Sequence, residues 1–89
     1  MANLNIKKKT TQPVNRGPLK ISIIGMGYVG LPMAMRFAEI GDKIIGFDLD
    51  HSKIDSLKKS KSYLSHIDSK AIKSLNKLDF LPSANAQSL

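Results

Sequence analysis

The chain of 89 residues contains no cysteine. This absence excludes disulfide bonds, thiolate metal ligands and cysteine nucleophiles within these residues. Long apolar runs are also missing, since no stretch approaches the roughly 18 residues that a membrane-spanning helix needs. The two histidines, His51 and His66, are isolated from other ligand residues, so a metal site is not favoured. The lysines near the N-terminus have no apolar segment behind them, which excludes a secretory signal. We therefore expect a cytoplasmic protein.

Acidic residues are scarce, with 7 Asp and Glu against 14 Lys and Arg, and the net charge is +7. The first 20 residues contain no acid, whereas the lysines at 53–77 are interleaved with Asp55 and Asp68. A solvated basic tail and solvated helix faces account for this charge. A nucleic-acid site is the alternative, but no aromatic residue lies among the tail lysines to stack on bases.

The length allows one small domain. Residues 1–19 mix Asn, Thr, Gln, Lys and Pro without periodicity, which predicts a disordered basic leader ending at Gly17-Pro18. Residues 20–89 are expected to fold.

The folding part is organised around a glycine motif. A short apolar run at 20–24 predicts a strand, and GMGYVG at residues 25–30 follows it directly. Helical spacing of Gly30, Met33, Ala34, Phe37 and Ala38 predicts a helix at about 28–40 that faces a sheet. A second strand at 44–47 ends in Asp48. This order is that of the first half of a dinucleotide-binding fold, in which a strand, a glycine turn, a helix and a second strand are followed by an acidic residue.

Each glycine of this motif has its own role. Gly25 permits a tight turn out of the strand, Gly27 leaves room for a pyrophosphate, and Gly30 lets the helix pack closely on the strand. The amides of Tyr28 and Val29 lie at the helix N-terminus, where they and the helix dipole attract an anion.

Asp48 follows Gly30 by 18 residues and lies where a carboxylate can accept hydrogen bonds from both hydroxyls of an adenosine ribose. A carboxylate also repels a 2′-phosphate, and residues 49–53 contain no arginine to neutralise one. The expected cofactor is therefore NAD rather than NADP, with Lys53 as the nearest cation. The alternative is a glycine turn in some other βαβ unit, with Asp48 as an exposed acid at a strand end.

The remaining residues predict helices at about 51–60 and 69–78, with a loop at 60–67 that packs Tyr63, Leu64 and Ile67 onto the domain. The segment 80–89 looks extended around Pro82, and no third Val/Ile-rich strand is apparent. A parallel sheet needs more strands and both faces covered. We therefore expect an α/β, Rossmann-like parallel sheet present only as its N-terminal fragment, in the order β-α-β-α-α.

The stretch GMGYVGLP at residues 25–32, followed by GFDLD at 46–50 and SYLSHI at 62–67, resembles the N-terminal end of the UDP-glucose/GDP-mannose dehydrogenase family. The SYLSHI stretch is most similar to the branch that oxidises UDP-N-acetylhexosamines. The resemblance extends from about Lys20 to the end of the chain.

This resemblance implies a cytoplasmic oxidoreductase that converts the C6 alcohol of a UDP-sugar to a carboxylate in two NAD-dependent steps. It also implies a homo-oligomeric parent enzyme, with substrate and catalytic residues outside this chain and with no nucleic-acid or membrane partner. The isolated chain is expected to be inactive, with its third strand starting just after Leu89. The implied cofactor-binding residues are Gly25, Met26, Gly27, Tyr28, Val29, Gly30, Asp48 and Lys53.

Two other functions remain open at this stage. A 3-hydroxyisobutyrate-type dehydrogenase shares the GLPMA helix, but its turn usually has Asn-Met where this chain has Tyr28-Val29. A non-enzymatic NAD-binding regulatory module is the other alternative, and it requires a stable fold without the rest of the sheet.

Overall fold

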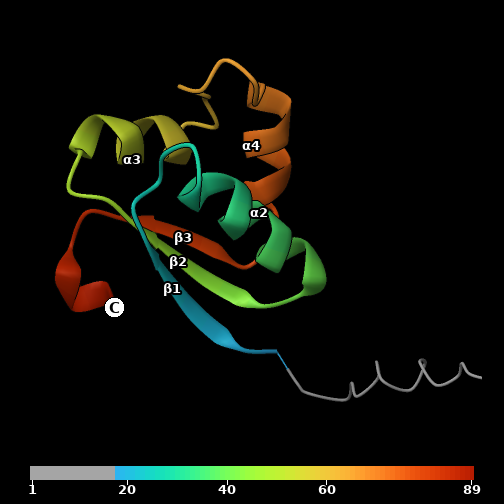
Figure 1. Cartoon of the computed structure of the whole chain (residues 1–89), viewed down its shortest axis with the longest axis vertical. Coiled ribbons are helices and arrows are strands. Elements are labelled where there is room, and N and C mark those ends of the chain that lie inside the picture. Colours follow the sequence, from blue (N-terminus) through green and yellow to red (C-terminus); the bar gives the residue numbers. More distant parts are fainter. Residues whose placement is uncertain (1–17) are drawn as a thin grey trace, which may run out of the picture.

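The computed structural model of the chain describes residues 18–89, which form three parallel strands with the α-helices on one side (Figure 1). In chain order the elements are β1 (Lys20–Ile24), α2 (Gly30–Ile40), β2 (Lys43–Phe47), α3 (His51–Lys58), α4 (Ser69–Asn76), β3 (Phe80–Ser83) and a short 3-10 helix, η1 (Ala86–Ser88). The Rossmann-like α/β class predicted from the sequence is confirmed. Most of the predicted leader lies outside the described residues.

The sequence-based expectation that no third strand is present before Leu89 is wrong, because β3 lies at Phe80–Ser83. β3 pairs in parallel with β2, and the strand order is β1-β2-β3. The segment FLPS lacks the β-branched residues that mark a buried strand, and Pro82 cannot donate to a ladder. It forms a strand because β2 supplies the partner groups, and proline is tolerated at the edge of a sheet.

The strand register brings three carboxyl ends together. Ile24 of β1 lies opposite Phe47 of β2, and Phe47 lies opposite Ser83 of β3. The residues that follow these strands therefore meet at one edge of the sheet. This edge is where open parallel α/β sheets bind their ligands.

Helix α2 begins at Gly30, two residues later than predicted, and ends where Gly41 adopts a left-handed φ of 111°. Its buried residues are Leu31, Ala34 and Ala38. Met33 was predicted to face the sheet but is 44% exposed. The small side chains of the two alanines let the helix approach the sheet closely, which places Met33 outside the contact and Leu31 within it.

Helices α3 and α4 both start at carboxylate caps. Asp50 accepts the N–H of Ser52, and Asp68 accepts the N–H of Ala71. The core lies between the helices and the sheet and includes Leu64 and Ile67 from the intervening loop. Its buried members are Ile23, Met26, Leu31, Ala34, Ala38, Ile44, Ile54, Leu57, Leu64, Ile67, Ile72 and Leu75.

Asp42 anchors the beginning of the sheet, which sequence reasoning did not foresee. Its side chain is buried, and its carboxylate accepts the N–H of Leu19 at 3.0 Å. The carbonyl of Leu19 in turn accepts the N–H of Lys43 at 2.7 Å. Leu19, which was assigned to the leader, is thus bound to the folded domain.

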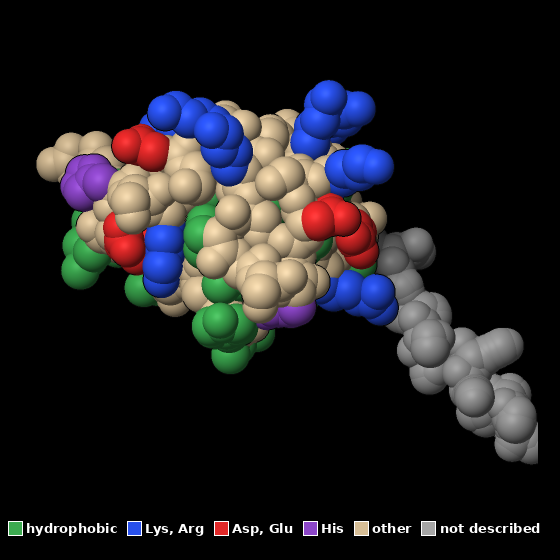
Figure 2. All heavy atoms as spheres, turned by 90° about the horizontal axis from the view of Figure 1, so that it is seen from above, with side chains coloured by type: hydrophobic (Ala, Val, Ile, Leu, Met, Phe, Trp, Pro, Cys, Tyr) green, Lys and Arg blue, Asp and Glu red, His purple; other side chains and the backbone are tan. Residues whose placement is uncertain are grey.

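The outer faces of the helices are charged and mixed in sign. Figure 2 shows lysine and arginine side chains distributed around this side of the molecule, with acidic side chains between them. The exposed lysines between residues 58 and 77 are Lys58, Lys59, Lys61, Lys70, Lys73 and Lys77. This distribution is that of solvated helix faces.

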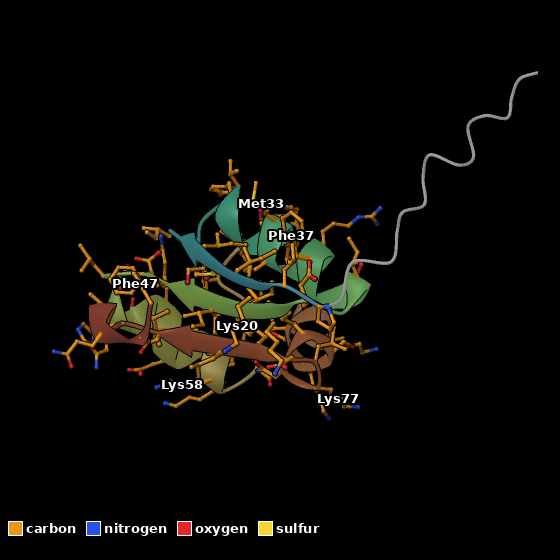
Figure 3. All side chains as sticks on the ribbon, turned by 90° about the horizontal axis from the view of Figure 1, so that it is seen from below. Lys20, Met33, Phe37, Phe47, Lys58 and Lys77 are labelled. Atoms are coloured by element: carbon orange, nitrogen blue, oxygen red, sulfur yellow. The ribbon has the colours of Figure 1, made fainter. Side chains whose placement is uncertain are left out.

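The opposite face of the sheet carries no α-helix within residues 18–89, as Figure 3 shows from below. The side chains of β1 alternate, with Ile23 buried against the helices and Ile24 71% exposed. Within the described residues β1 forms an edge of the sheet, and only one of its faces is covered by α-helices.

Candidate functional site

The glycine turn lies beside Asp48 at the carboxyl edge of the sheet. The ladder continues past the strands, because the N–H of Gly25 donates to the carbonyl of Phe47 at 2.7 Å. On the other side, the N–H of Asp48 donates to the carbonyl of Ser83 at 3.1 Å. The two parts of the predicted motif are therefore held together by backbone hydrogen bonds.

Two glycines of the turn have clearly different surroundings. A Cβ at Gly30 would lie 1.6 Å from the carbonyl oxygen of Gly25, so the start of α2 packs directly on the turn. A Cβ at Gly27 would meet nothing nearer than Nζ of Lys53, at 4.0 Å. Gly30 is thus required by the fold itself. The space in front of Gly27 is open, as close approach of a ligand to the backbone requires.

The N-terminus of α2 has free donors. Val29 is its N-cap residue and provides no side-chain cap. Within residues 18–89, the N–H groups of Tyr28 and Val29 donate to no protein acceptor. Both residues are exposed, at 69% and 73%. Such unpaired amides at a helix N-terminus, together with the helix dipole, bind phosphate groups.

Asp48 is held by the turn that it faces. Its Oδ2 accepts the N–H of Met26 at 2.8 Å, and its Oδ1 accepts the N–H of Asp50 at 2.9 Å. Desolvation raises the pKa of Asp48, but the N–H donors of Asp50 and Met26 and the charge of Lys53 outweigh it and lower the pKa below its usual value. Asp48 is therefore an ionised acceptor at neutral pH, and each oxygen has a lone pair left.

Lys53 lies between the acid and the turn. Its Nζ is 3.9 Å from Oδ2 of Asp48 and 4.0 Å from the position of a Cβ on Gly27. The structure thus brings this predicted site residue to the open space in front of the turn. Met26, another predicted cofactor residue, has a fully buried side chain. Only its backbone can act at the site.

The structure adds Tyr63 and His66, which sequence reasoning did not place at the site. The hydroxyl of Tyr63 donates to the carbonyl of Met26 at 2.6 Å. Nζ of Lys53 lies 6.0 Å from the centroid of the Tyr63 ring. The ring of His66 stacks on Tyr28, with a centroid distance of 5.4 Å. The only signal in the sequence was the expectation that Tyr63 packs on the domain.

These residues fit a dinucleotide. The open space at Gly27 and the unpaired amides suit a pyrophosphate, while the ionised Asp48 beside them suits a pair of ribose hydroxyls. A bound nicotinamide cofactor supplies hydride transfer. The residues of this chain contribute binding and orientation.

A comparison with protein families decides the assignment. Residues 19–84 match the UDP-glucose/GDP-mannose dehydrogenase family, NAD binding domain. The chain belongs to this family. The family resemblance noted in the sequence is therefore confirmed, and NAD is the cofactor of the matched domain. The match does not favour the 3-hydroxyisobutyrate-type or regulatory alternatives.

Individual relatives agree with this membership. The UDP-glucose 6-dehydrogenase TuaD of Bacillus subtilis is 59% identical over 39 residues, which cover 44% of this chain and 8% of that protein. A UDP-N-acetyl-D-glucosamine 6-dehydrogenase of Pseudomonas aeruginosa is 32% identical over 62 residues, which cover 70% of this chain and 14% of that protein.

A solved structure shares the fold. The UDP-D-ManNAc dehydrogenase of Pyrococcus horikoshii superimposes with a TM-score of 0.70 at 26% identity, covering 79% of this chain and 17% of that chain. The chain of 89 residues thus covers less than a fifth of the length of each of these three relatives.

Two further features complete the description of residues 18–89. None of their helices is long and apolar enough to cross a membrane. They also contain no group of three or more His, Asp or Glu side chains placed to hold a metal ion.

Proposed function

We propose that this chain is the NAD-binding part of a UDP-sugar 6-dehydrogenase, which oxidises the C6 alcohol of the sugar to a carboxylate in two NAD-dependent steps. One observation carries the proposal. The open space at Gly27 lies between unpaired helix amides and the ionised Asp48, inside the segment that matches the family's NAD-binding domain. The names of the relatives support the reaction class.

We assign each site residue a role that the geometry of the turn and the family resemblance support. The amides of Tyr28 and Val29 bind the pyrophosphate, and Gly27 leaves it room. Asp48 accepts hydrogen bonds from the adenosine ribose, and Lys53 covers the outer side of that ribose. Gly25 and Gly30 shape the turn, and Met26 acts through its backbone.

The proposed substrate is a UDP-sugar of the UDP-N-acetylglucosamine or UDP-glucose type. The SYLSHI stretch at residues 62–67 favours the N-acetylated sugars, and several relatives are named for UDP-N-acetylated sugars. Contacts to the sugar are assigned to residues outside this chain. As the family resemblance implies, we place the parent enzyme in the cytoplasm as a homo-oligomer.

Calorimetric titration of the full chain with NAD tests the cofactor role. We expect saturable binding by the wild type and weaker binding by Gly27→Val, whose side chain occupies the space for the pyrophosphate. Exposed Lys70 lies on α4. Lys70→Ala is therefore the matched control and is expected to bind as the wild type does. No binding by a folded wild-type chain would refute the proposal.

Activity is tested at two levels. The isolated chain, mixed with NAD and a panel of UDP-sugars, is expected to produce no NADH, because the family resemblance places the substrate-binding and catalytic residues outside this chain. A parent enzyme carrying this domain is expected to produce two NADH per UDP-sugar oxidised. A parent that reduces NAD with none of these sugars would contradict the assigned substrate class.

A further inference from the structure

The loop at residues 62–67 is fastened to the glycine turn. The hydroxyl of Tyr63 donates to the carbonyl of Met26 at 2.6 Å, across 37 residues of sequence. The loop is itself anchored, since Leu64 and Ile67 are both buried in the core. Tyr63 therefore holds the turn from a fixed position.

The hydrogen bond from Tyr63 restrains the backbone next to Gly27, where the chain is most free to rotate. The carbonyl of Met26 and the N–H of Gly27 belong to one planar trans peptide and point in opposite directions. Fixing the carbonyl therefore fixes the N–H. Gly27 has no side chain to limit its own rotation, so an external restraint is needed.

A second restraint acts on the same residue. The N–H of Met26 donates to Asp48 at 2.8 Å, so both backbone polar groups of Met26 are held by side chains. The stack of His66 on Tyr28, with an angle of 8° between the rings, joins the same loop to the far side of Gly27. The peptide groups that lead into α2 are thus held on both sides.

We propose that Tyr63 is a positioning residue for the cofactor: its hydroxyl orients the Met26–Gly27 peptide so that the amides of Tyr28 and Val29 face the pyrophosphate of NAD. This inference rests on the proposed NAD binding. A turn ordered in advance loses less conformational entropy when the ligand binds, and affinity rises accordingly. Tyr63 has no contact with the nucleotide in this scheme.

The raised pKa of Tyr63 keeps its hydroxyl protonated and therefore able to donate this hydrogen bond. Desolvation, with the nearby charges of Asp48 and Asp50, raises the pKa of Tyr63 to about 12. The hydroxyl therefore keeps its proton across the pH range in which the protein works.

Tyr63→Phe tests the proposal, because it removes one oxygen and keeps the ring beneath Lys53. We expect NAD to bind about three- to tenfold more weakly in calorimetry, the effect of losing one neutral hydrogen bond. Adenosine, followed by NMR titration, lacks the pyrophosphate and is expected to bind the variant and the wild type equally. This contrast separates positioning of the turn from general damage to the fold.

Ser62→Ala is the matched control within the same loop. The hydroxyl of Ser62 bonds with the backbone of Leu64 and does not contact the turn. Its NAD affinity is expected to equal that of the wild type. The inference is overturned if Tyr63→Phe binds NAD as the wild type does, if both variants lose affinity equally, or if adenosine weakens by the same factor. Failure of the wild type to bind NAD would instead refute the proposed function.

Discussion

The carboxylate of Asp48 accepts the N–H of Met26 at 2.8 Å, which joins the end of β2 to the glycine turn after β1. The residue proposed to select the ribose therefore also shapes the site for the pyrophosphate. Two roles that the sequence assigns to separate residues are coupled through this one hydrogen bond. Substitutions at Asp48 are expected to change both.

Asp48→Ala is expected to weaken NAD binding about ten- to a hundredfold in calorimetry. The reason is the loss of charge-assisted hydrogen bonding to the ribose, which contributes roughly 1.5–3 kcal/mol in total. Asp55 is an exposed acid on α3, outside the turn, and Asp55→Ala is the control expected to bind NAD normally. Unchanged NAD affinity in the Asp48 variant would remove this residue from the site.

Selectivity between the two cofactors gives a separate prediction. The wild type is expected to bind NAD more tightly than NADP, because the ionised Asp48 repels a 2′-phosphate. Asp48→Asn removes that repulsion while Lys53 remains, so the ratio of the two affinities is expected to fall. The measurement is a pair of titrations with NAD and NADP on both proteins. A ratio that is the same in both would contradict the assigned role of the charge.

The lowered pKa of Asp48 predicts how stability depends on pH. A carboxyl group whose pKa is lower in the folded state stabilises that state above its unfolded pKa of about 4, and this contribution is lost as the pH falls through the folded pKa. The urea midpoint of the wild type is therefore expected to drop on acidification below about pH 4. The drop is expected to be smaller in Asp48→Asn. Identical pH profiles would show that Asp48 contributes nothing to acid unfolding.

Gly30 and Gly27 are expected to respond differently to substitution by alanine. In Gly30→Ala the new Cβ meets the carbonyl oxygen of Gly25, so the unfolding free energy is expected to fall by at least about 2 kcal/mol. In Gly27→Ala nothing in the protein obstructs the Cβ, so thermal unfolding stays close to wild type while NAD binding weakens. Equal loss of stability in both variants would contradict this division.

The secondary structure before residue 79 could be predicted closely from local patterns. β1 has the predicted bounds, and the ends of the helices are set by local signals, with Asp50 and Asp68 as N-caps and Gly41 as a C-cap. These features depend on neighbouring residues, such as a side-chain oxygen that reaches an amide two or three positions ahead. β3 could not be predicted in this way, because its partners are the backbone groups of β2, far away in the sequence.

The site also has features that local sequence predicts and features that depend on contacts between distant residues. The sequence by itself determined the glycine turn, the acid at the end of β2 and hence the choice of a dinucleotide, because the residue types at that spacing carry the chemistry. Only the tertiary structure decided that Tyr63 and Asp48 hold the two sides of Met26. These hydrogen bonds join residues 37 and 22 positions apart, and no periodicity or propensity acts over such distances. Packing of the 62–67 loop into the core brings Tyr63 to the turn, and pairing of β1 with β2 brings Asp48 there.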